Sequence, residues 1–425
     1  MSQSLVVLLG DMVAGTLHSL PNGRVRFEYE DEYREREAVT PLSLSMPTQL
    51  RMHTHEVVGP WLWGLLPDND AVLRRWAGQF HVSASSAFSL LSSPVGEDCA
   101  GAVRFCHPDK VEEAIARSGT VVWLTDDEVG ARIRELKRDS TAWLGRSFTG
   151  QFSLAGAQAK TALLFEDGRW GVPSGTRATS HILKPAVLGF DDHDLNEHLS
   201  LQAARFAGLA VAQTRIATFG GESAVVVTRY DRFLTDRGVL HRIHQEDVCQ
   251  ALSVHPSHKY QNEGGPTPGD VARLFRNTMP PSIADEATRR FADALIWNWL
   301  IAGTDAHAKN YSLLLSDGDV RLAPLYDIAS ALPYRVHEKK LRMAMKIGGD
   351  YAVSPGFNAW PKAAAELGLE PEMVVQRVRE LASVAPDAYA QAAAAPEVVA
   401  LNRESPSRLV SLVADRAARC ARVVG

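Results

Sequence analysis

The stretch Gly303-Thr-Asp-Ala-His-Ala-Lys-Asn310 determines the fold that this chain can adopt. It sets a carboxylate at Asp305 and an amide at Asn310, five positions apart. An apolar run follows, Asp-Gly turns the chain at 317–318, and a second apolar run leads to Pro324-Leu-Tyr-Asp327. Asp-Gly between two apolar runs is a strong signal for a β-hairpin. Because a hairpin brings its two ends together, we expect Asn310 and Asp327 to lie side by side.

The residue types at these positions suit phosphoryl transfer. Protein kinases place a catalytic Asp and a metal-binding Asn at this spacing, where the Asp accepts the proton of the attacking hydroxyl and the Asn oxygen holds Mg²⁺. Two neighbouring oxygen ligands also suit a Mg²⁺ ion that is bound mainly through phosphates. Taken alone, Asp305 could simply end a helix and Asp327 could simply occupy a turn. The flanking segments must therefore decide between a catalytic and a purely structural role for these residues.

The segment before this loop predicts a buried helix. Residues Glu286 to Ile301 contain neither proline nor glycine, and from Ala294 onward nearly every face is apolar. A helix that is apolar all round is buried, and Gly303 is a natural helix stop. We therefore expect the loop with Asp305 to leave a rigid core helix.

A candidate phosphate-binding loop lies earlier, at Phe152-Ser-Leu-Ala-Gly-Ala-Gln-Ala-Lys160, and it runs into the probable strand Thr161-Ala-Leu-Leu-Phe165. Small residues before a strand let backbone N–H groups approach a phosphate closely. The segment is not a Walker A motif, because it holds only one glycine and no Gly-Lys-Thr. By itself it could equally be an ordinary flexible loop.

Three further segments follow in the order that a kinase requires. Ser180-His-Ile-Leu-Lys184 predicts a strand that ends in lysine, and Leu195 to Phe206 predicts an amphipathic helix that carries Glu197. A strand lysine paired with a helix glutamate positions the α- and β-phosphates in kinases. The β-forming run Ser223 to Tyr230 then predicts a hinge that would bind adenine through backbone groups.

Taken in order, these segments resemble the HipA family of bacterial serine/threonine kinases, the toxins of type II toxin–antitoxin systems. The matching segments are Ser153–Thr161, His181–Lys184, Asn196-Glu197, Arg229–Arg232, Gln245–Gln250, Asn298–Ile301, Thr304–Asn310 and Pro324–Asp327, preceded by Pro41–Pro47, Leu65–Asp68 and Gly101–Val103. The resemblance thus extends over most of the chain, to about residue 350. Two positions depart from the family pattern: Ala159 replaces an acidic residue, and Tyr230 replaces a phenylalanine.

The resemblance implies an α+β, bilobal protein-kinase-like fold with an N-terminal mixed subdomain and a helical C-terminal lobe. It implies Asp305 as the catalytic base, Asn310 and Asp327 as Mg²⁺ ligands, and Ser153 as a site of autophosphorylation that expels the phosphate loop. The residues expected to contact ATP are Ser153, Ala155, Gly156, Ala157, Lys160, Lys184, Glu197, Thr228, Tyr230, Asp231, His307 and Lys309. Of these, His307 is expected to form structural hydrogen bonds rather than to act as a second base.

The function implied is that of an ATP- and Mg²⁺-dependent protein serine/threonine kinase and toxin. The implied substrate is an aminoacyl-tRNA synthetase, whose phosphorylation would halt translation, and the implied partner is a helix-turn-helix antitoxin of the HipB type that binds DNA for both. Two alternatives stay open: a co-repressor within an antitoxin–DNA complex with little kinase role, and a kinase for small molecules.

The composition limits the classes of protein to which this chain could belong. The net charge of −5 and the pI near 6.3 give no overall electrostatic footprint for nucleic acid. We interpret the basic run Arg132 to Arg138 as a solvated helix face. The four cysteines form no Cys-x-x-Cys pair, which indicates reduced thiols, and neither a signal segment nor an apolar run of 18 residues is present. We expect a soluble cytoplasmic protein without a membrane partner.

Three regions are expected: an N-terminal subdomain at 1–110, a nucleotide-binding region at 111–270 and a helical catalytic lobe at 271–425. The alanine-rich stretch 363–395 predicts short packed helices. A zinc site is conceivable from His241, His244, Cys249, His255 and His258. Zinc ligands usually come in compact pairs, and only the first two of these form one, so we interpret the histidines as hydrogen-bonded or solvated.

Overall fold

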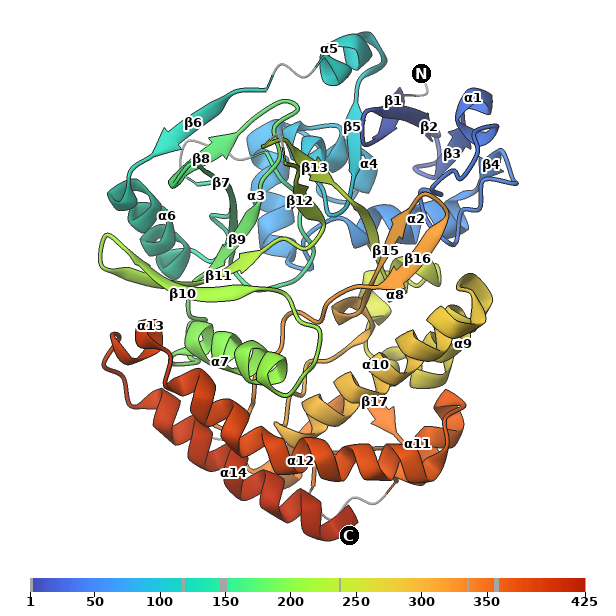
Figure 1. Cartoon of the computed structure of the whole chain (residues 1–425). Helices are drawn as coiled ribbons and strands as arrows, with labels where there is room; N and C mark the ends of the chain where they lie inside the picture. Colours follow the sequence, from blue (N-terminus) through green and yellow to red (C-terminus); the bar gives the residue numbers. More distant parts are fainter. Residues whose placement is uncertain are drawn as a thin grey trace.

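The computed structural model describes residues 3–116, 119–145, 151–236, 238–334, 336–354 and 359–424. Figure 1 shows the sheets of the first half of the chain in the upper part of the molecule and the helices of the second half below them. Across these described ranges, no helix combines the length and the apolar surface that crossing a bilayer requires.

The N-terminal sheet is antiparallel and has five strands in the order β4-β3-β2-β1-β5. Its strands are β1 (Gln3–Leu9), β2 (Met12–Ser19), β3 (Val25–Tyr29), β4 (Met52–His53) and β5 (Val103–Cys106). Three helices pack against it: α2 (His55–Gly64), α3 (Asp70–Phe80) and α4 (Ala87–Leu91). Alternate residues of β1, such as Leu5 and Val7, are fully buried against Trp61 and Trp76 of these helices.

The second sheet is also antiparallel and has six strands in the order β10-β11-β9-β7-β8-β6. Its strands are β6 (Val121–Leu124), β7 (Thr161–Glu166), β8 (Arg169–Pro173), β9 (His181–Lys184), β10 (Thr214–Phe219) and β11 (Glu222–Thr228). Helix α6 (Asp126–Arg138) packs Val129 and Ile133 against this sheet. Its basic run is only partly solvated, because Arg134 and Lys137 both bind Glu222, each at 2.9 Å.

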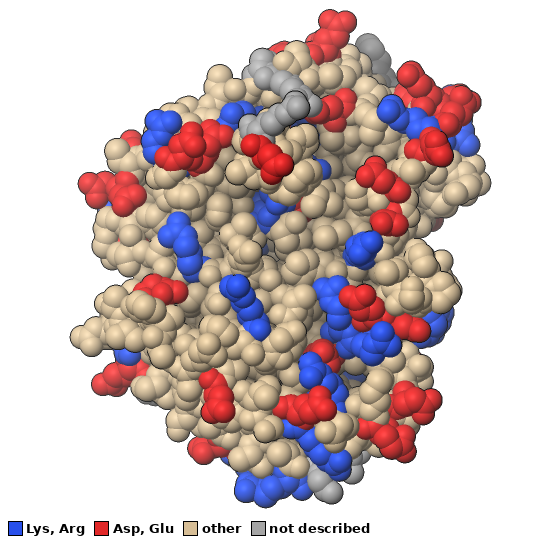
Figure 2. All heavy atoms as spheres, viewed as in Figure 1, with Lys and Arg blue, Asp and Glu red and all other residues tan. Residues whose placement is uncertain are grey.

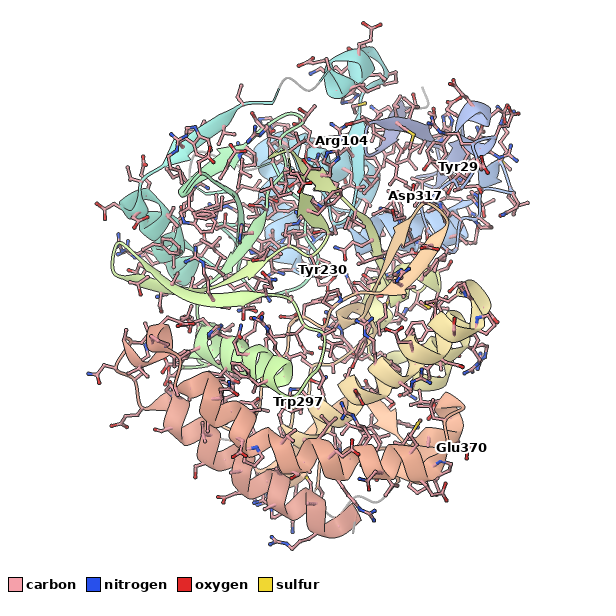
Figure 3. The ribbon with its side chains drawn as sticks, in the orientation of Figure 1. Tyr29, Arg104, Tyr230, Trp297, Asp317 and Glu370 are labelled. Carbon is pink, nitrogen blue, oxygen red and sulfur yellow. The ribbon has the colours of Figure 1, made fainter. Side chains whose placement is uncertain are left out.

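The helical half is built around α10 (Pro281–Leu300), whose last turns are buried on all sides as predicted. Around it pack α7 (His193–Phe206), α9 (Pro268–Thr278), α11 (Trp360–Leu367), α12 (Pro371–Ala393) and α14 (Ser405–Val424). In Figure 3, Trp297 of α10 lies next to α12, where its ring stacks on Tyr389. The prediction of short helices is wrong for α12, a 23-residue helix that continues through Pro386. Packing against α7 and α14 outweighs the hydrogen bond that proline removes.

The predicted hairpin is present as β15 (Ser312–Ser316) and β16 (Asp319–Leu322). Strand β14 (His244–Asp247) pairs with β15 and completes a three-stranded sheet. This sheet joins strands from before and after residue 270, and near residue 110 the chain passes from β5 of the first sheet to β6 of the second. The division of the chain at residues 110 and 270 stays a prediction.

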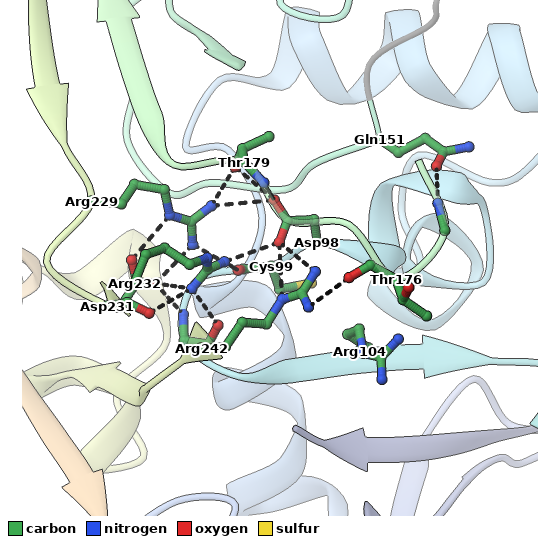
Figure 4. A network of polar contacts seen from close by, with 12 residues as sticks. Asp98, Cys99, Arg104, Gln151, Thr176, Thr179, Arg229, Asp231, Arg232 and Arg242 are labelled. Carbon is green, nitrogen blue, oxygen red and sulfur yellow. Dashed lines mark hydrogen bonds and ion pairs between the residues drawn. The ribbon is translucent and has the colours of Figure 1, made fainter. Parts of the chain in front are cut away.

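Two polar clasps fasten the N-terminal subdomain to the remainder of the protein. In the first, Glu246 of β14 accepts hydrogen bonds from Leu44 N at 2.7 Å and from the Ser43 hydroxyl. The second, drawn in Figure 4, centres on the buried carboxylate of Asp98. This carboxylate contacts Arg229 at 3.4 Å, Arg232 at 3.0 Å and Arg242 at 3.1 Å, and it accepts from the hydroxyl of Thr179 at 2.6 Å.

Two carboxylates face the three guanidinium groups of the second clasp. Burial alone would raise the pKa of Asp98, but the three guanidinium groups hold it well below its usual range. A second carboxylate, that of Asp231, pairs with Arg229 at 2.7 Å and accepts from the Gly101 amide at 2.7 Å. The clasp therefore holds the N-terminal subdomain against the segment that follows β11.

Replacing Asp98 with alanine should destabilise the protein strongly. Three buried guanidinium groups would lose their shared carboxylate, and breaking a buried ion pair from one side costs about 3–5 kcal/mol. Urea unfolding, followed by intrinsic tryptophan fluorescence, measures the change.

The control is Asp109→Ala, since this carboxylate is exposed. A loss below about 1 kcal/mol in Asp98→Ala, as for a surface pair, would contradict the role given to the clasp. Because folding lowers the pKa of Asp98, its contribution should be present above about pH 4 and should be lost as the pH falls below that value.

Candidate active site

A cavity of about 550 Å³ opens between the two halves of the molecule. Its wall contains the phosphate-loop residues from Leu154 to Gln158, the ends of β9 and β11, the loop after α10, and the segment after β16. Tyr230, which follows β11, lies between the sheets and the helices in Figure 3. The structure thus brings segments that are distant in the sequence, such as those with Leu154 and Asp327, into one cavity wall.

Lys184 links the end of β9 to α7 and to the segment after β16. Its ammonium lies 2.7 Å from Oε1 of Glu197 on α7 and 2.7 Å from Oδ1 of Asp327 after the hairpin. Burial alone would lower the pKa of Lys184, but the two carboxylates raise it above its usual value. Burial raises the pKa of Glu197, whose second oxygen, Oε2, has no hydrogen-bond partner in the described part of the chain.

The loop that carries Asp305 is held by its own residues. The Gly303 amide donates to Asn298 O at 2.7 Å, and a Cβ at position 303 would lie 2.4 Å from the side-chain oxygen of Asn298. Only glycine therefore fits where the chain leaves α10. Five residues on, Nδ2 of Asn310 donates to the backbone carbonyl of Asp305 at 2.7 Å. This bond fixes the amide and leaves its oxygen for another ligand.

Asp327 adopts a left-handed backbone conformation with φ of +57°. Such conformations are uncommon outside glycine, asparagine and aspartate, and they concentrate at functional sites. The preceding residue is fixed, because the Tyr326 hydroxyl bonds to the hydroxyl of Ser312 at 2.7 Å and to Lys309 O at 2.6 Å. The hairpin thereby places Asp327 and Asn310 in the same cavity wall.

These two side chains fit a magnesium ion by their chemistry. Both offer oxygen, the donor that Mg²⁺ prefers, and a site with so few protein ligands suits an ion that keeps water and phosphate oxygens in its shell. Burial alone would raise the pKa of Asp327, but Lys184 and Lys160 hold it well below its usual range, so the carboxylate is charged.

The phosphate loop carries its own buried cation. The ammonium of Lys160 donates to Ala155 O at 2.6 Å and lies 4.8 Å from the ring centre of Trp143. Gly156 has φ of +101°, and a Cβ there would lie 2.6 Å from this ammonium. Burial, and then the neighbouring ammonium of Lys184, lower the pKa of Lys160 to about 8.

Ser153 lies behind the phosphate loop rather than in the cavity wall. It is fully buried; its hydroxyl donates to Leu65 O at 2.8 Å and its amide donates to Asp98 O at 2.9 Å. The short pairing with Cys99 turns the side chain toward the N-terminal subdomain. In this conformation the Ser153 side chain does not line the cavity, and its contact with a nucleotide stays a prediction.

Asp231 lines the cavity, but its polar groups already have partners. Its carboxylate belongs to the buried clasp around Asp98, and its carbonyl accepts from the Ile243 amide and from Arg232, each at 2.9 Å. Thr228 and Tyr230 line the cavity. The Tyr230 hydroxyl bonds to Gln245, and its ring lies 5.6 Å from that of Tyr326.

The predicted site residues did not include Asp68, Lys259 and Tyr260, which lie in the cavity wall. The Tyr260 hydroxyl donates to Oδ1 of Asp305 at 2.5 Å. Asp68 accepts from Lys259 at 2.8 Å and from Lys309 at 2.6 Å. Of these three residues, only Asp68 lies in a segment, Leu65–Asp68, whose sequence resembled the family.

His307 also lies in this wall. Its ring packs edge-on against Tyr260 at 4.9 Å, and its Nδ1 has no hydrogen-bond partner among the described residues. Burial lowers the pKa of His307, which keeps the ring neutral at pH 7. The hydrogen-bonding role expected of it is therefore not seen at Nδ1 in this conformation.

The histidines considered for zinc are dispersed. His244 is buried, with Nε2 2.9 Å from Leu42 O and Nδ1 3.4 Å from the Ala102 amide, while the ring of His241 stacks on Phe233. Within the described ranges, no group of three or more His, Cys, Asp or Glu side chains is placed to hold a metal ion.

Comparison with protein-family models gives the affiliation of the chain. The model described as the HipA-like C-terminal domain matches residues 152–389, and the model described as the HipA N-terminal domain matches residues 5–106. The chain belongs to the HipA family. The two matched ranges together contain the residues that line the cavity.

Curated relatives support the same affiliation. Y4mE of Sinorhizobium fredii, named as a kinase, is 34% identical over 87% of this chain and 87% of its own length. The serine/threonine-protein kinase toxin HipA of Shewanella oneidensis is 27% identical over 99% of this chain and 96% of its own.

A solved structure shares the fold. HipA of Shewanella oneidensis, determined with HipB and its operator DNA, matches with a TM-score of 0.82 over 99% of this chain and 97% of its own, at 24% identity. The α+β, bilobal kinase-like fold predicted from the sequence is thereby confirmed.

The affinity for ATP should depend on the charge of Lys160. Because the pKa of Lys160 is about 8 in the free protein, ATP phosphates would stabilise its ammonium, and affinity should fall about three- to tenfold as the pH rises from about 7 to about 9. Calorimetric titration with ATP measures this. Lys160→Met, uncharged throughout, should bind more weakly and lack this fall; an equal fall in both proteins would contradict the assignment.

Proposed function

We propose that this chain, a member of a family of serine/threonine kinases, is an ATP- and Mg²⁺-dependent protein kinase and the toxin of a type II toxin–antitoxin system. The observation that carries the proposal is the contact of Lys184 with both Glu197 and Asp327 in the cavity that also holds Asp305. In kinases the lysine–glutamate pair and the metal-binding aspartate must both be in place before phosphoryl transfer.

Each residue of the site is proposed to have a separate role in phosphoryl transfer. Lys184 binds phosphate oxygens of ATP, and the backbone N–H groups of the loop around Gly156 surround them. Asn310 and Asp327 would hold Mg²⁺, which when bound neutralises charge on the phosphates. Asp305 orients the acceptor hydroxyl and accepts its proton as the bond to the γ-phosphorus forms and the bond to ADP breaks.

The acceptor is proposed to be a serine or threonine of an aminoacyl-tRNA synthetase, as the family resemblance implies. Ser153 is the proposed site of autophosphorylation. Its hydroxyl is buried and bonded to Leu65 O, so the loop must first leave its position. A phosphate there would add nearly two negative charges, which the buried site cannot accommodate, and the loop would stay displaced.

The proposed partner is a helix-turn-helix antitoxin of the HipB type, which supplies the contact with DNA. On the face drawn in Figure 2, acidic and basic side chains are interspersed, and the net charge of the chain is −5. A protein that binds DNA by itself usually carries a basic face, so an indirect contact is the better proposal. The system is proposed to act in the cytoplasm.

Asp305→Ala should lower the rate of phosphoryl transfer by roughly 10²–10⁴, the range for a general base. Labelled ATP and Mg²⁺ are added to a bacterial lysate with wild type or variant, and proteins are separated by size. A band that the variant fails to label would identify the substrate. Unchanged labelling by the variant would refute the role of Asp305. Absence of all label, with Ser153 unmodified, would favour the co-repressor.

Asp327→Asn should raise the Mg²⁺ concentration that gives half the maximal rate by roughly tenfold or more. The change preserves size but removes a ligand charge, while Lys184 keeps its contact with Glu197. The rate is measured across a Mg²⁺ titration at saturating ATP. Asp319→Asn, an exposed change at the hairpin turn, serves as the control. A single titration curve for all three proteins would exclude Asp327 as a ligand.

A further inference from the structure

Asp68 is a carboxylate of the N-terminal subdomain that lies in the wall of the catalytic cavity. It follows α2 and precedes α3. Its Oδ1 lies 2.6 Å from the ammonium of Lys309, and its Oδ2 lies 2.8 Å from the ammonium of Lys259. The three side chains are 10%, 2% and 14% exposed, in that order, so water screens these contacts little.

Both lysines belong to the immediate surroundings of the catalytic base. Lys309 directly precedes Asn310, and its carbonyl accepts from the Tyr326 hydroxyl at 2.6 Å. The carbonyl of Lys259 accepts from the Ala308 amide at 3.3 Å. The next residue, Tyr260, donates to Asp305. Asp68 thus binds the segments with Lys259 and Lys309, and these two segments in turn contact the loop that carries Asp305.

The same turn also contacts the phosphate loop. The Asp68 amide donates to Gly156 O at 3.0 Å, and Nδ2 of Asn69 lies 3.5 Å from Ala157 O. The side chain of Asp68 is therefore bound to the catalytic loop while its backbone is bound to the phosphate loop. No other described residue outside these two loops makes hydrogen bonds to both Lys309 Nζ and Gly156 O.

The carboxylate of Asp68 is ionised at neutral pH. Burial alone would raise the pKa of Asp68, but Lys309 and Lys259 together lower it to about 2. If the carboxylate were neutralised by mutation, two buried ammonium groups would lose their shared partner. Each would then reorient toward other acceptors in the cavity, which include Asp247 and Asp305.

We propose that Asp68 is a positioning residue for phosphoryl transfer, which fixes the catalytic loop relative to the phosphate loop through Lys309, Lys259 and Gly156. The N-terminal subdomain thereby completes the catalytic centre. This inference rests on the kinase function proposed above, since the distance between the two loops sets the distance between the γ-phosphate and the base. A misplacement of about 1 Å can cost about 10² in rate.

The test compares four full-length proteins: wild type, Asp68→Asn, Asp68→Glu and the control Asp70→Asn. Asp70 lies two residues on, in the first turn of α3, and is exposed. We expect Asp68→Asn to lower kcat about 100-fold while the KM for ATP changes less than about threefold, because Lys184 and its partners are intact. Asp68→Glu should recover most of kcat, and Asp70→Asn should match the wild type.

Hydrogen–deuterium exchange provides a readout that does not need catalysis. Peptides covering residues 153–160 and 304–310 should exchange faster in Asp68→Asn than in wild type or Asp70→Asn, while peptides of the buried helix α10 should be unchanged. Faster exchange throughout the protein would mean a general loss of stability and would overturn the positioning role.

The outcomes separate this inference from the kinase proposal. If the wild type transfers phosphate and Asp68→Asn has the same kcat as the wild type, the inference about Asp68 is overturned and the kinase function stands. If the wild type transfers no phosphate, the kinase function fails, and the exchange data alone decide whether Asp68 holds the two loops. Equal exchange of both loops in all four proteins would overturn the inference in either case.

Discussion

One buried ammonium, that of Lys184, connects the two halves of this protein at the point where chemistry is proposed. It comes from a central strand of the second sheet and contacts a carboxylate of α7 and another after β16. Two carboxylates around one ammonium leave one negative charge, which the nearby ammonium of Lys160 offsets. A dication held at Asp327, as proposed, would make the site net positive and would thereby favour the entry of a polyphosphate. The arrangement thus couples the binding of the metal to that of the nucleotide.

Buried charge also explains why the N-terminal subdomain is inseparable from the remainder. Asp98 is surrounded by three arginines from the segment after β11, Asp68 is bound to two lysines beside the catalytic loop, and Glu246 receives the segment with Ser43. Each of these contacts would leave an unpaired buried group if the subdomain moved away, and such groups are costly. The first hundred residues are consequently part of the enzyme's framework and not an appended module.

Local patterns in the sequence predicted the parts of the fold that local physics controls. The hairpin at 312–322, the buried helix that ends at Leu300, the strand that ends at Lys184 and the helix with Glu197 are all present. Asp-Gly turns, apolar periodicity and glycine stops act within a few residues, which is why they could be identified.

Features that depend on distant partners could not be predicted in this way. The orientation of Ser153 is set by Leu65 and Asp98, and the carboxylate of Asp231 is occupied by a clasp that includes Gly101. Lys259 and Tyr260 carry no motif, and their positions follow from contacts with Asp68 and Asp305. Likewise, α12 continues through a proline because neighbouring helices bury it. Tertiary contacts of this kind override local preference.

The contact between Ser43 and Glu246 spans 203 residues, and this has a consequence for synthesis on the ribosome. At about 5–20 residues per second, Ser43 leaves the ribosome roughly 10–40 s before Glu246. During that interval the segment that includes Ser43 and Leu44 has no acceptor, and the loop that carries Asp305 has not yet been made. The catalytic cavity can therefore form only after the segment up to Asp327 has emerged. An interval of this length gives a partner protein time to meet the chain before the enzyme is complete.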